Sequence, residues 1–198
     1  MDEIVKQAIA KWPNVPHCYG WLALDARGQW RMRDERTQTL NLPGDRITNA
    51  ALLAFINRNY THDEQGRWYF QNGPQHVYVN LEATPYVART DPAHGFVLHT
   101  GELMSNIENA WLTETGQLLL KSAEKIAIVD DRDMAQCIAM LWMDGRPVED
   151  GQLLDWLSNR QDGDTLTLRH ERKQFPIQRI ALDASEKYFG FVRAPQPA

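Results

Sequence analysis

The sequence predicts an α+β fold that consists mostly of antiparallel β-hairpins and meanders with a few short helices. Three observations indicate it: apolar residues alternate on both sides of glycine-containing turns, short segments carry apolar residues at helical spacing, and one turn motif recurs along the chain. The chain has 198 residues, 43% of them apolar, so it is long enough to bury a substantial core. We expect two related α+β units, residues 1–100 and 101–198, or a single compact globule.

Each element follows from its local pattern. Residues 2–12 carry apolar side chains at helical spacing, and the prolines of WPNVP end this helix because proline cannot continue it. In YGWLALDARGQWRMRD (19–34), apolar residues alternate about a glycine-containing turn, which predicts a hairpin with Trp30 facing the core. Further elements are expected in this order: an irregular segment or short edge strand (36–45), a helix (47–60), a β-meander (62–90), a strand pair (96–102 and 109–131), a helix or strand (134–143), a helix (148–160), a hairpin (164–182) and a fraying tail (193–198).

Two kinds of internal repeat occur. The turn motif recurs around Gly28, Gly66 and Gly116, with Asp or Thr three residues before each glycine and Trp or Leu two residues after it. Over a longer span, residues 42–57 align without a gap on residues 143–158, and both segments precede predicted strands. These matches predict a fold built from repeated hairpin-helix-hairpin units. The alternative is chance similarity of two amphipathic helices, because helical spacing alone forces several of the matches.

Composition and charge exclude several classes of protein. The formal net charge is −5, which argues against a broad electrostatic footprint for nucleic acid. No apolar run is long enough to cross a bilayer, and the acidic start MDEIVKQAIAKW lacks the apolar region of a secretory signal. Cys18 and Cys137 belong to no CxxC pair and are expected to be free thiols. We therefore expect a cytoplasmic protein that binds neither nucleic acid nor membranes.

The catalytic motifs with the strongest signals are missing from the sequence. It contains no GxSxG, Walker loop, GxGxxG or HExxH. Three weaker clusters are His94 with His99 and Glu102, Asp130 with Asp131 and Asp133, and Glu82 with Asp91 and Glu102. They could provide metal ligands or an acid/base pair, but surface histidines and helix-capping aspartates are the simpler interpretation of the first two. We predict no metal site and no cofactor.

Aromatic residues are abundant, with seven Trp and six Tyr. Aromatic side chains with a polar tip suit a binding groove, because each contributes a large contact area and one hydrogen bond. Alternation places Trp30 and Trp68 in the core instead. The candidate ligand-binding residues are Tyr69, Tyr78, Tyr86, Arg89 and His99.

Two stretches, IVKQAIAKWPNVPHCYGWLALDARGQWRMRDERTQ and GRWYFQNGPQHVYVNLEATPYV, resemble a proteobacterial family of uncharacterised proteins over most of the first 90 residues. DARGQW, LLAFI, DEQGRWYF and TPYVA are also similar to the pattern of a second family of unknown function. The second resemblance implies a fold of repeated hairpin motifs with a role in ligand sensing or signal transduction. Neither resemblance implies catalytic residues.

The leading hypothesis is a module that binds or senses a small molecule or a protein partner in an aromatic-lined groove. One alternative is a hydrolase that uses dispersed carboxylates and histidines around His99 and Asp131. Another is a structural protein that forms a homodimer through exposed sheet edges.

Overall fold

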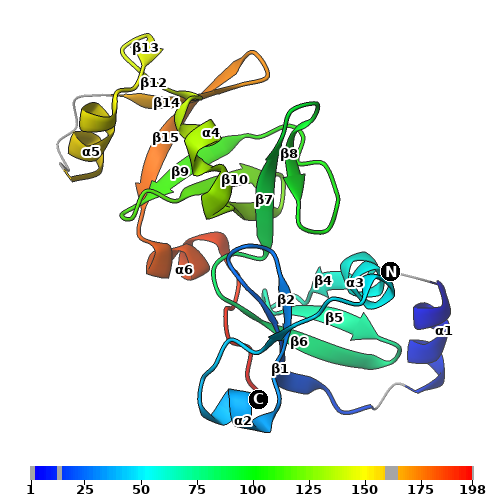
Figure 1. Cartoon of the computed structure of the whole chain (residues 1–198). Helices are drawn as coiled ribbons and strands as arrows, with labels where there is room; N and C mark the ends of the chain where they lie inside the picture. The colour runs from blue at the N-terminus through cyan, green and yellow to red at the C-terminus, as the bar shows by residue number, and fades with distance from the viewer. Residues whose placement is uncertain (1–2, 13–14, 159–164, 198) are drawn as a thin grey trace. The chain divides into compact units, whose positions relative to one another are not determined.

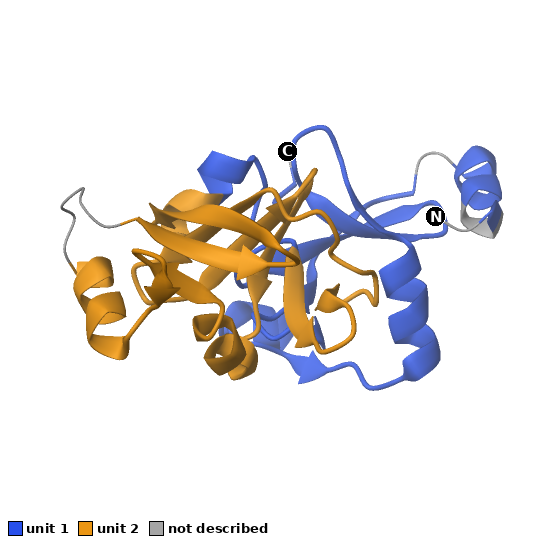
Figure 2. Ribbon diagram, turned by 90° about the horizontal axis from the view of Figure 1, so that it is seen from above, with its two compact units in different colours: residues 1–85, 186–198 blue, residues 86–185 orange. Residues whose placement is uncertain are grey.

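The computed structural model describes residues 3–12, 15–158 and 165–197 and has the predicted α+β fold (Figure 1). The described part contains two β-sheets, in which most strand pairs are antiparallel, and six short α-helices. The chain divides into two compact units (Figure 2). Unit 1 comprises residues 1–85 and 186–198, and unit 2 comprises residues 86–185.

Unit 1 is built on a six-stranded sheet with the strand order β3-β2-β1-β6-β5-β4. Its strands are β1 (Cys18–Leu24), β2 (Trp30–Met32), β3 (Asp45–Arg46), β4 (Tyr60–His62), β5 (Trp68–Asn72) and β6 (Gln75–Leu81). The helices that belong wholly to this unit are α1 (Glu3–Lys11), α2 (Glu35–Thr39) and α3 (Ala50–Arg58). Strands β1 and β6 run parallel, and the other pairs in this sheet are antiparallel.

The two faces of this sheet differ in chemistry. Helix α3 carries Phe55, whose ring contacts Phe70 of β5 edge to face at a centroid distance of 5.4 Å. This apolar face also buries Trp30 and Trp68, which are 2% and 6% exposed, so the prediction that both anchor the core is confirmed. Side chains alternate along a strand, so the opposite face of β6 carries His76, Tyr78 and Asn80. The polar face of the sheet holds the candidate site.

The recurring turn motif has the same local structure in its three copies. Gly28, Gly66 and Gly116 have φ of +75°, +73° and +80°, a region that glycine adopts without steric cost. In each copy the side chain three residues before the glycine accepts a backbone N–H from the residue after the glycine. These acceptor and donor residues are Asp25 and Gln29, Asp63 and Arg67, and Thr113 and Gln117. The motif is therefore a turn-building element.

Unit 2 is built on a nine-stranded sheet with the order β13-β12-β14-β15-β9-β10-β11-β7-β8. Its strands are β7 (Tyr86–Asp91), β8 (Gly95–Leu98), β9 (Asn109–Thr113), β10 (Leu118–Ser122), β11 (Lys125–Val129), β12 (Leu141–Met143), β13 (Arg146–Pro147), β14 (Leu166–His170) and β15 (Lys173–Ile180). Helices α4 (Met134–Ile138) and α5 (Asp150–Ser158) belong to this unit, and α6 (Ser185–Phe189) begins at its last residue. Leu118, Leu119 and Leu120 are all fully buried, so both faces of β10 are covered.

Several local predictions need correction. The segment 36–45 contains the edge strand β3 as one alternative held, but it begins with helix α2, because the Asp34 side chain caps that helix by accepting the N–H of Thr37. Residues 134–143, predicted as helix or strand, contain both α4 and β12. The tail was expected to fray, yet Arg193 accepts the N–H of Leu81 at 2.8 Å.

The longer repeat stays a prediction. Both copies contain a two-residue strand followed by a nine-residue helix, β3 with α3 and β13 with α5. Their strands occupy different positions in the two sheets, however, because β14 pairs with β12 whereas β5 lies three places from β2. The expected halves, 1–100 and 101–198, likewise stay a prediction about domains.

Candidate functional site

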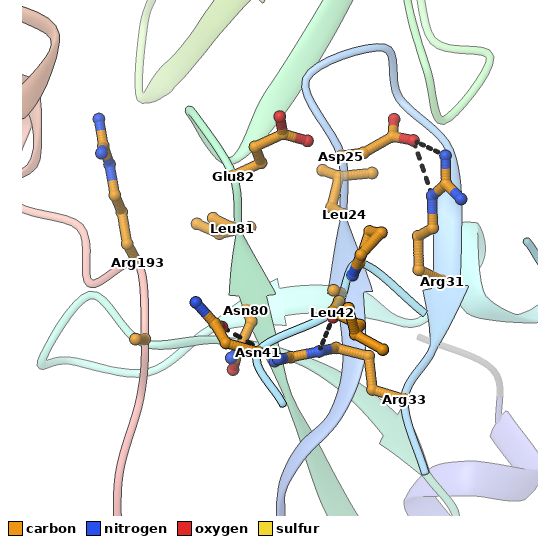
Figure 3. A pocket seen from close by; sticks show the side chains of 13 residues that line it. Leu24, Asp25, Arg31, Arg33, Asn41, Leu42, Asn80, Leu81, Glu82 and Arg193 are labelled. Carbon is orange, nitrogen blue, oxygen red and sulfur yellow. Dashed lines mark hydrogen bonds and ion pairs between the residues drawn. The ribbon is translucent and has the colours of Figure 1, made fainter. Parts of the chain in front are cut away.

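A cavity of about 340 Å³ opens on the polar face of unit 1 (Figure 3). It lies over the ends of β1 and β6, where Ala23 pairs with Asn80 on one side and with Arg31 on the other. The small side chain of Ala23 leaves room above the sheet between these two polar neighbours. The lining residues are Ala23, Leu24, Asp25, Arg31, Arg33, Asn41, Leu42, Pro43, Asn80, Leu81, Glu82, Arg193 and Ala194.

Arg33 is the buried cation of this cavity. Arg33 is the first residue after β2, and it is only 7% exposed. The guanidinium donates from Nε to the carbonyl of Leu42 at 3.2 Å and from Nη2 to Asn41 Oδ1 at 3.4 Å. Within the described part of the chain, no carboxylate forms an ion pair with it. A buried charge is normally paired, so the missing counter-charge needs an explanation.

Two amides line the same cavity. Because Asn41 accepts from Arg33 with its oxygen, its amide orientation is fixed and its Nδ2 is left as a donor. Asn80 Oδ1 is shut off from solvent and has no hydrogen-bond partner among the described residues. At this end of the cavity, Arg33 and Asn41 thus offer N–H donors, and Asn80 offers an unpartnered acceptor oxygen.

The carboxylates lie at the other end, just beyond the last paired residues of β1 and β6. Asp25 Oδ2 accepts from Arg31 Nε at 2.9 Å, and the two residues form an ion pair. Glu82 Oε2 accepts the N–H of Ala26 at 2.9 Å. Three arginines and two carboxylates line the cavity as a whole.

The C-terminal segment closes one side of the cavity. Arg193 is held by its backbone, because its N–H donates to Glu186 Oε1 at 2.9 Å and its carbonyl accepts from Leu81. Figure 3 shows its side chain on the opposite side of Leu81 from Asp25 and Arg31. A residue from the end of the chain thus completes a site that otherwise belongs to the first 85 residues.

Two of the predicted ligand-binding residues, Tyr69 and Tyr78, lie together elsewhere on the polar face. They are cross-strand partners on β5 and β6, and both are buried. The His76 ring is stacked between His17 and Tyr69, at centroid distances of 4.3 and 4.1 Å. Tyr78 stacks on Tyr19 at 4.6 Å. These rings are packed mainly against one another.

Asp63 organises the charges of this aromatic group. It accepts from Arg67 Nε at 2.8 Å and from the Tyr78 hydroxyl at 3.1 Å. Burial raises the pKa of Asp63, but the hydrogen bonds from Arg67 and Tyr78 outweigh burial, so the pKa lies below its usual value. Burial, and then the bond to Asp63, raise the pKa of Tyr78. Burial, and then His17, lower the pKa of His76.

Tyr86 and His99 lie in unit 2, whereas Tyr69 and Tyr78 belong to unit 1. Their ring centroids are 5.8 Å apart, and His99 Nδ1 accepts the N–H of Val87 at 3.2 Å. Burial lowers the pKa of His99 to about 3. An imidazole with this pKa is neutral at pH 7, and its proton affinity is poorly matched to general base catalysis.

Arg89 forms a third group with aspartates of unit 2. Its Nε lies 3.8 Å from the carboxylates of both Asp130 and Asp133. Asp130 accepts the N–H of Arg132, and Asp133 accepts the N–H of Thr90 at 2.7 Å. Asp130 therefore caps the short 3-10 helix Asp131–Asp133, as the capping interpretation expects, whereas Asp133 precedes α4 without a capping bond from its side chain.

Side chains of the other predicted clusters also pair with neighbouring side chains. Asp91 accepts from His94 Nδ1 at 2.9 Å, and Glu102 forms an ion pair with Lys125. Among the described residues, no group of three His, Cys, Asp or Glu side chains is arranged to hold a metal ion. In the same part of the chain, no helix is both long and apolar enough to span a bilayer.

A second cavity of unit 1, of about 390 Å³, lies between α3 and the apolar face of the sheet. Its walls include Trp21, Phe55 and Phe70, so it is an aromatic-lined groove. Asn72 is the one amide in its lining, so this groove has few groups with which to select a polar ligand.

The prediction of site residues did not include Arg33, Asn41, Asn80 or Arg193. A signal for part of this set is present in WRMRD, where Arg31 and Arg33 are two residues apart and therefore share one face of a strand. Arg193 carries no such signal, because only the fold brings the tail to β6.

Comparisons with known proteins address the family and not the site. Two solved structures of DUF1285 family proteins are similar to the chain. The one from Silicibacter pomeroyi DSS-3 has 14% identity and a TM-score of 0.49, and covers 94% of this chain and 99% of its own. The one from Shewanella baltica OS155 has 13% identity and a TM-score of 0.40, and covers 59% of this chain and 88% of its own.

No curated protein matches the chain. The model of one family, DUF2944, matches residues 1–196, and its description reads "Protein of unknown function (DUF2946)". A match over this length also agrees with the expectation of an uncharacterised family. The chain belongs to this family of unknown function.

Proposed function

We propose that the protein is a small-molecule-binding module, of the kind used in sensing, and that an anion binds in the arginine-lined cavity of unit 1. The observation that carries the proposal is Arg33, a buried guanidinium in the cavity wall without a carboxylate partner among the described residues. The proposal assigns its counter-charge to the ligand.

The energetics favour this assignment. Removing an ion from water costs several kcal/mol even after the protein relaxes, and two hydrogen bonds to neutral acceptors offset only part of that cost. An incoming carboxylate or phosphate restores the charge balance and accepts charge-assisted hydrogen bonds from the guanidinium fork. The cavity volume of about 340 Å³ lies at the lower end of the range for small-molecule sites.

A thermal-shift screen over small carboxylates, phosphates and sulfate tests the proposal on the full chain. A ligand at about 100 times its Kd stabilises a protein by about 2.7 kcal/mol, which corresponds to a rise in Tm of about 5–10 °C at this chain length. Arg33→Met is expected to abolish this shift. Ala23→Leu is also expected to abolish it, because the added side chain fills the cavity without changing any charge.

Arg46→Met is the matched control. Arg46 lies exposed on β3 in the same unit and lines no part of the cavity. This variant is expected to keep the full anion response. If Arg33→Met lowers the Tm of the unliganded protein but retains the anion response, Arg33 has only a structural role and the proposal fails.

A protein partner or a homodimer stays a prediction. Light scattering of the full chain over a range of concentrations tests the homodimer directly. A monomer at all concentrations would remove the dimerisation alternative without affecting the anion site.

A further inference from the structure

We infer that the aromatic-lined groove of unit 1 is a second ligand site, which takes a neutral aromatic compound of about two fused rings. This site is separate from the arginine-lined cavity, because the two share none of their described lining residues. Three features support it: a distortion of β1, the depth of the groove, and the chemistry of its walls.

The distortion of β1 turns Trp21 into the groove. Between two of its pairs with β6, β1 has three residues, 19–21, where β6 has one. In an uninterrupted strand Trp21 would share the polar face with Ala23, because side chains alternate. Instead, Trp21 lines the groove together with its neighbour Leu22. A bulge redirects a side chain in this way, and bulges are over-represented beside functional sites.

Gly20 permits this distortion. Its φ of +80° lies in the region that favours glycine, and a Cβ at this position would lie 2.5 Å from Gln38 Oε1. Tyr19 stays on the polar face, where its ring stacks on Tyr78 at 4.6 Å. The aromatic side chains before and after Gly20 therefore serve different faces of the sheet.

The groove is deep, because its floor consists of core side chains. Leu22, Ile56 and Phe70 line it and are 3%, 2% and 6% exposed. Trp21 and Met32 also line it but are 41% and 46% exposed, so they form its rim. Exposed apolar side chains that gather in one place mark interaction sites, and a concave one that reaches the core suits an inserted compound.

The walls select a neutral aromatic compound. Of the described residues that line the groove, none is charged, so an ion would lose its hydration there without gaining a counter-charge. Phe55 and Phe70 are packed edge to face, and Trp21 adds a third ring, so a further aromatic ring finds favourable contacts. An apolar cavity of about 150 Å³ holds one benzene ring. A groove of about 390 Å³ therefore has room for two fused rings.

Asn72 and Cys18 place polar groups at one end of the groove. Asn72 ends β5 and Cys18 begins β1, so both lie where β6 begins, because β6 is antiparallel to β5 and parallel to β1. Within the described part of the chain, the Asn72 amide forms no side-chain hydrogen bond. The ligand is therefore expected to direct a single uncharged polar substituent, such as a hydroxyl group, toward Asn72.

Isothermal titration calorimetry of the full chain with 1-naphthol tests the site, since this compound has two fused rings and is neutral at pH 7. Its anionic analogue, 1-naphthoate, has the same rings and also carries the charge proposed for the arginine-lined cavity. It is therefore scored only by its ability to displace 1-naphthol. We expect 1-naphthol to bind, and 1-naphthoate to compete for the groove at least about tenfold more weakly.

Two variants locate the site. Val77→Phe adds a ring that fills the groove, and Trp21→Ala removes one of its walls. Each is expected to weaken the binding of 1-naphthol about tenfold or more. Trp12→Ala is the matched control, because Trp12 is 52% exposed and is not among the lining residues. Trp21 lies at the exposed rim, so its variant tests the site even if Val77→Phe does not fold.

The inference is overturned if 1-naphthol does not bind, if 1-naphthoate displaces it as tightly as 1-naphthol itself binds, or if neither variant changes the affinity. An affinity that falls as the protein concentration rises also overturns it, because a second copy of the chain would then occupy the groove. None of these results bears on the anion site, so either proposal can fail while the other stands.

Discussion

His99 should make the stability of unit 2 sensitive to acid, and His99→Gln should remove that sensitivity. The imidazole is buried, and its Nδ1 accepts the N–H of Val87 at 3.2 Å. Protonation of the ring would break this hydrogen bond and place a charge in the interior. Glutamine retains a side-chain acceptor but does not titrate near neutral pH.

The magnitude follows from the pKa of His99, which burial lowers from 6.5 to about 3. Because the folded-state pKa is the lower one, the unfolded chain binds the proton first. Stability is therefore lost as the pH falls below 6.5, and the loss is complete near pH 3. At 1.36 kcal/mol per pKa unit, the full loss is about 5 kcal/mol, of which about 2 kcal/mol should appear by pH 5.

Urea unfolding at pH 7 and pH 5, followed by NMR signals of unit 2, measures this loss. The wild-type protein should lose about 2 kcal/mol more than His99→Gln between the two pH values. His94→Gln, which removes an exposed histidine of the same unit, should behave as the wild type does. Equal losses in the wild type and in His99→Gln would refute the reasoning. So would an NMR signal of the His99 imidazole that titrates near pH 6.5 in the folded protein.

Further predictions concern unit 1 and the turn motif. Tyr78→Phe removes the hydroxyl that donates to Asp63, so the free energy of unfolding at pH 7 should fall by about 1–3 kcal/mol in a urea titration. The difference from the wild type should shrink once acid protonates Asp63, and a constant difference would contradict the bond. Gly66→Ala places a Cβ 2.0 Å from the carbonyl oxygen of Gly190, whereas Gly101→Ala meets no atom within 4 Å at a similarly positive φ. Both variants should lower the Tm through backbone strain, and Gly66→Ala should lower it further; equal losses would show that the close contact relaxes freely.

Local pattern was enough to predict most elements of the fold. The hairpin of β1 and β2, helix α3 and the hairpin of β5 and β6 each carry a clear period of two or of 3.6, and all are present. Helix α2 was missed because its five residues bury no side chain, so it has no apolar stripe to detect. The parallel pairing of β1 with β6 was missed because it joins strands more than 50 residues apart.

The site was harder to predict than the fold. Tyrosines were chosen as candidates because of their polar tips, but Tyr69 and Tyr78 are both buried, and the Tyr78 hydroxyl donates to Asp63. Arg33 was not predicted as a site residue because an arginine in a polar sequence is normally solvated. Its burial depends on the loop of Asn41 and Leu42 folding back over it, and no local sequence period encodes that contact.

The return of the C-terminal segment to unit 1 has a consequence for biosynthesis. Residues 86–185 separate the two parts of unit 1, and Arg193 belongs to the second part. On the ribosome, the cavity therefore lacks one wall until residue 193 has emerged, although the remaining lining residues up to Glu82 were made more than 100 residues earlier. A chain released early would expose the ends of β1 and β6 without that wall, so the proposed anion site is complete only in chains that have been translated past this point.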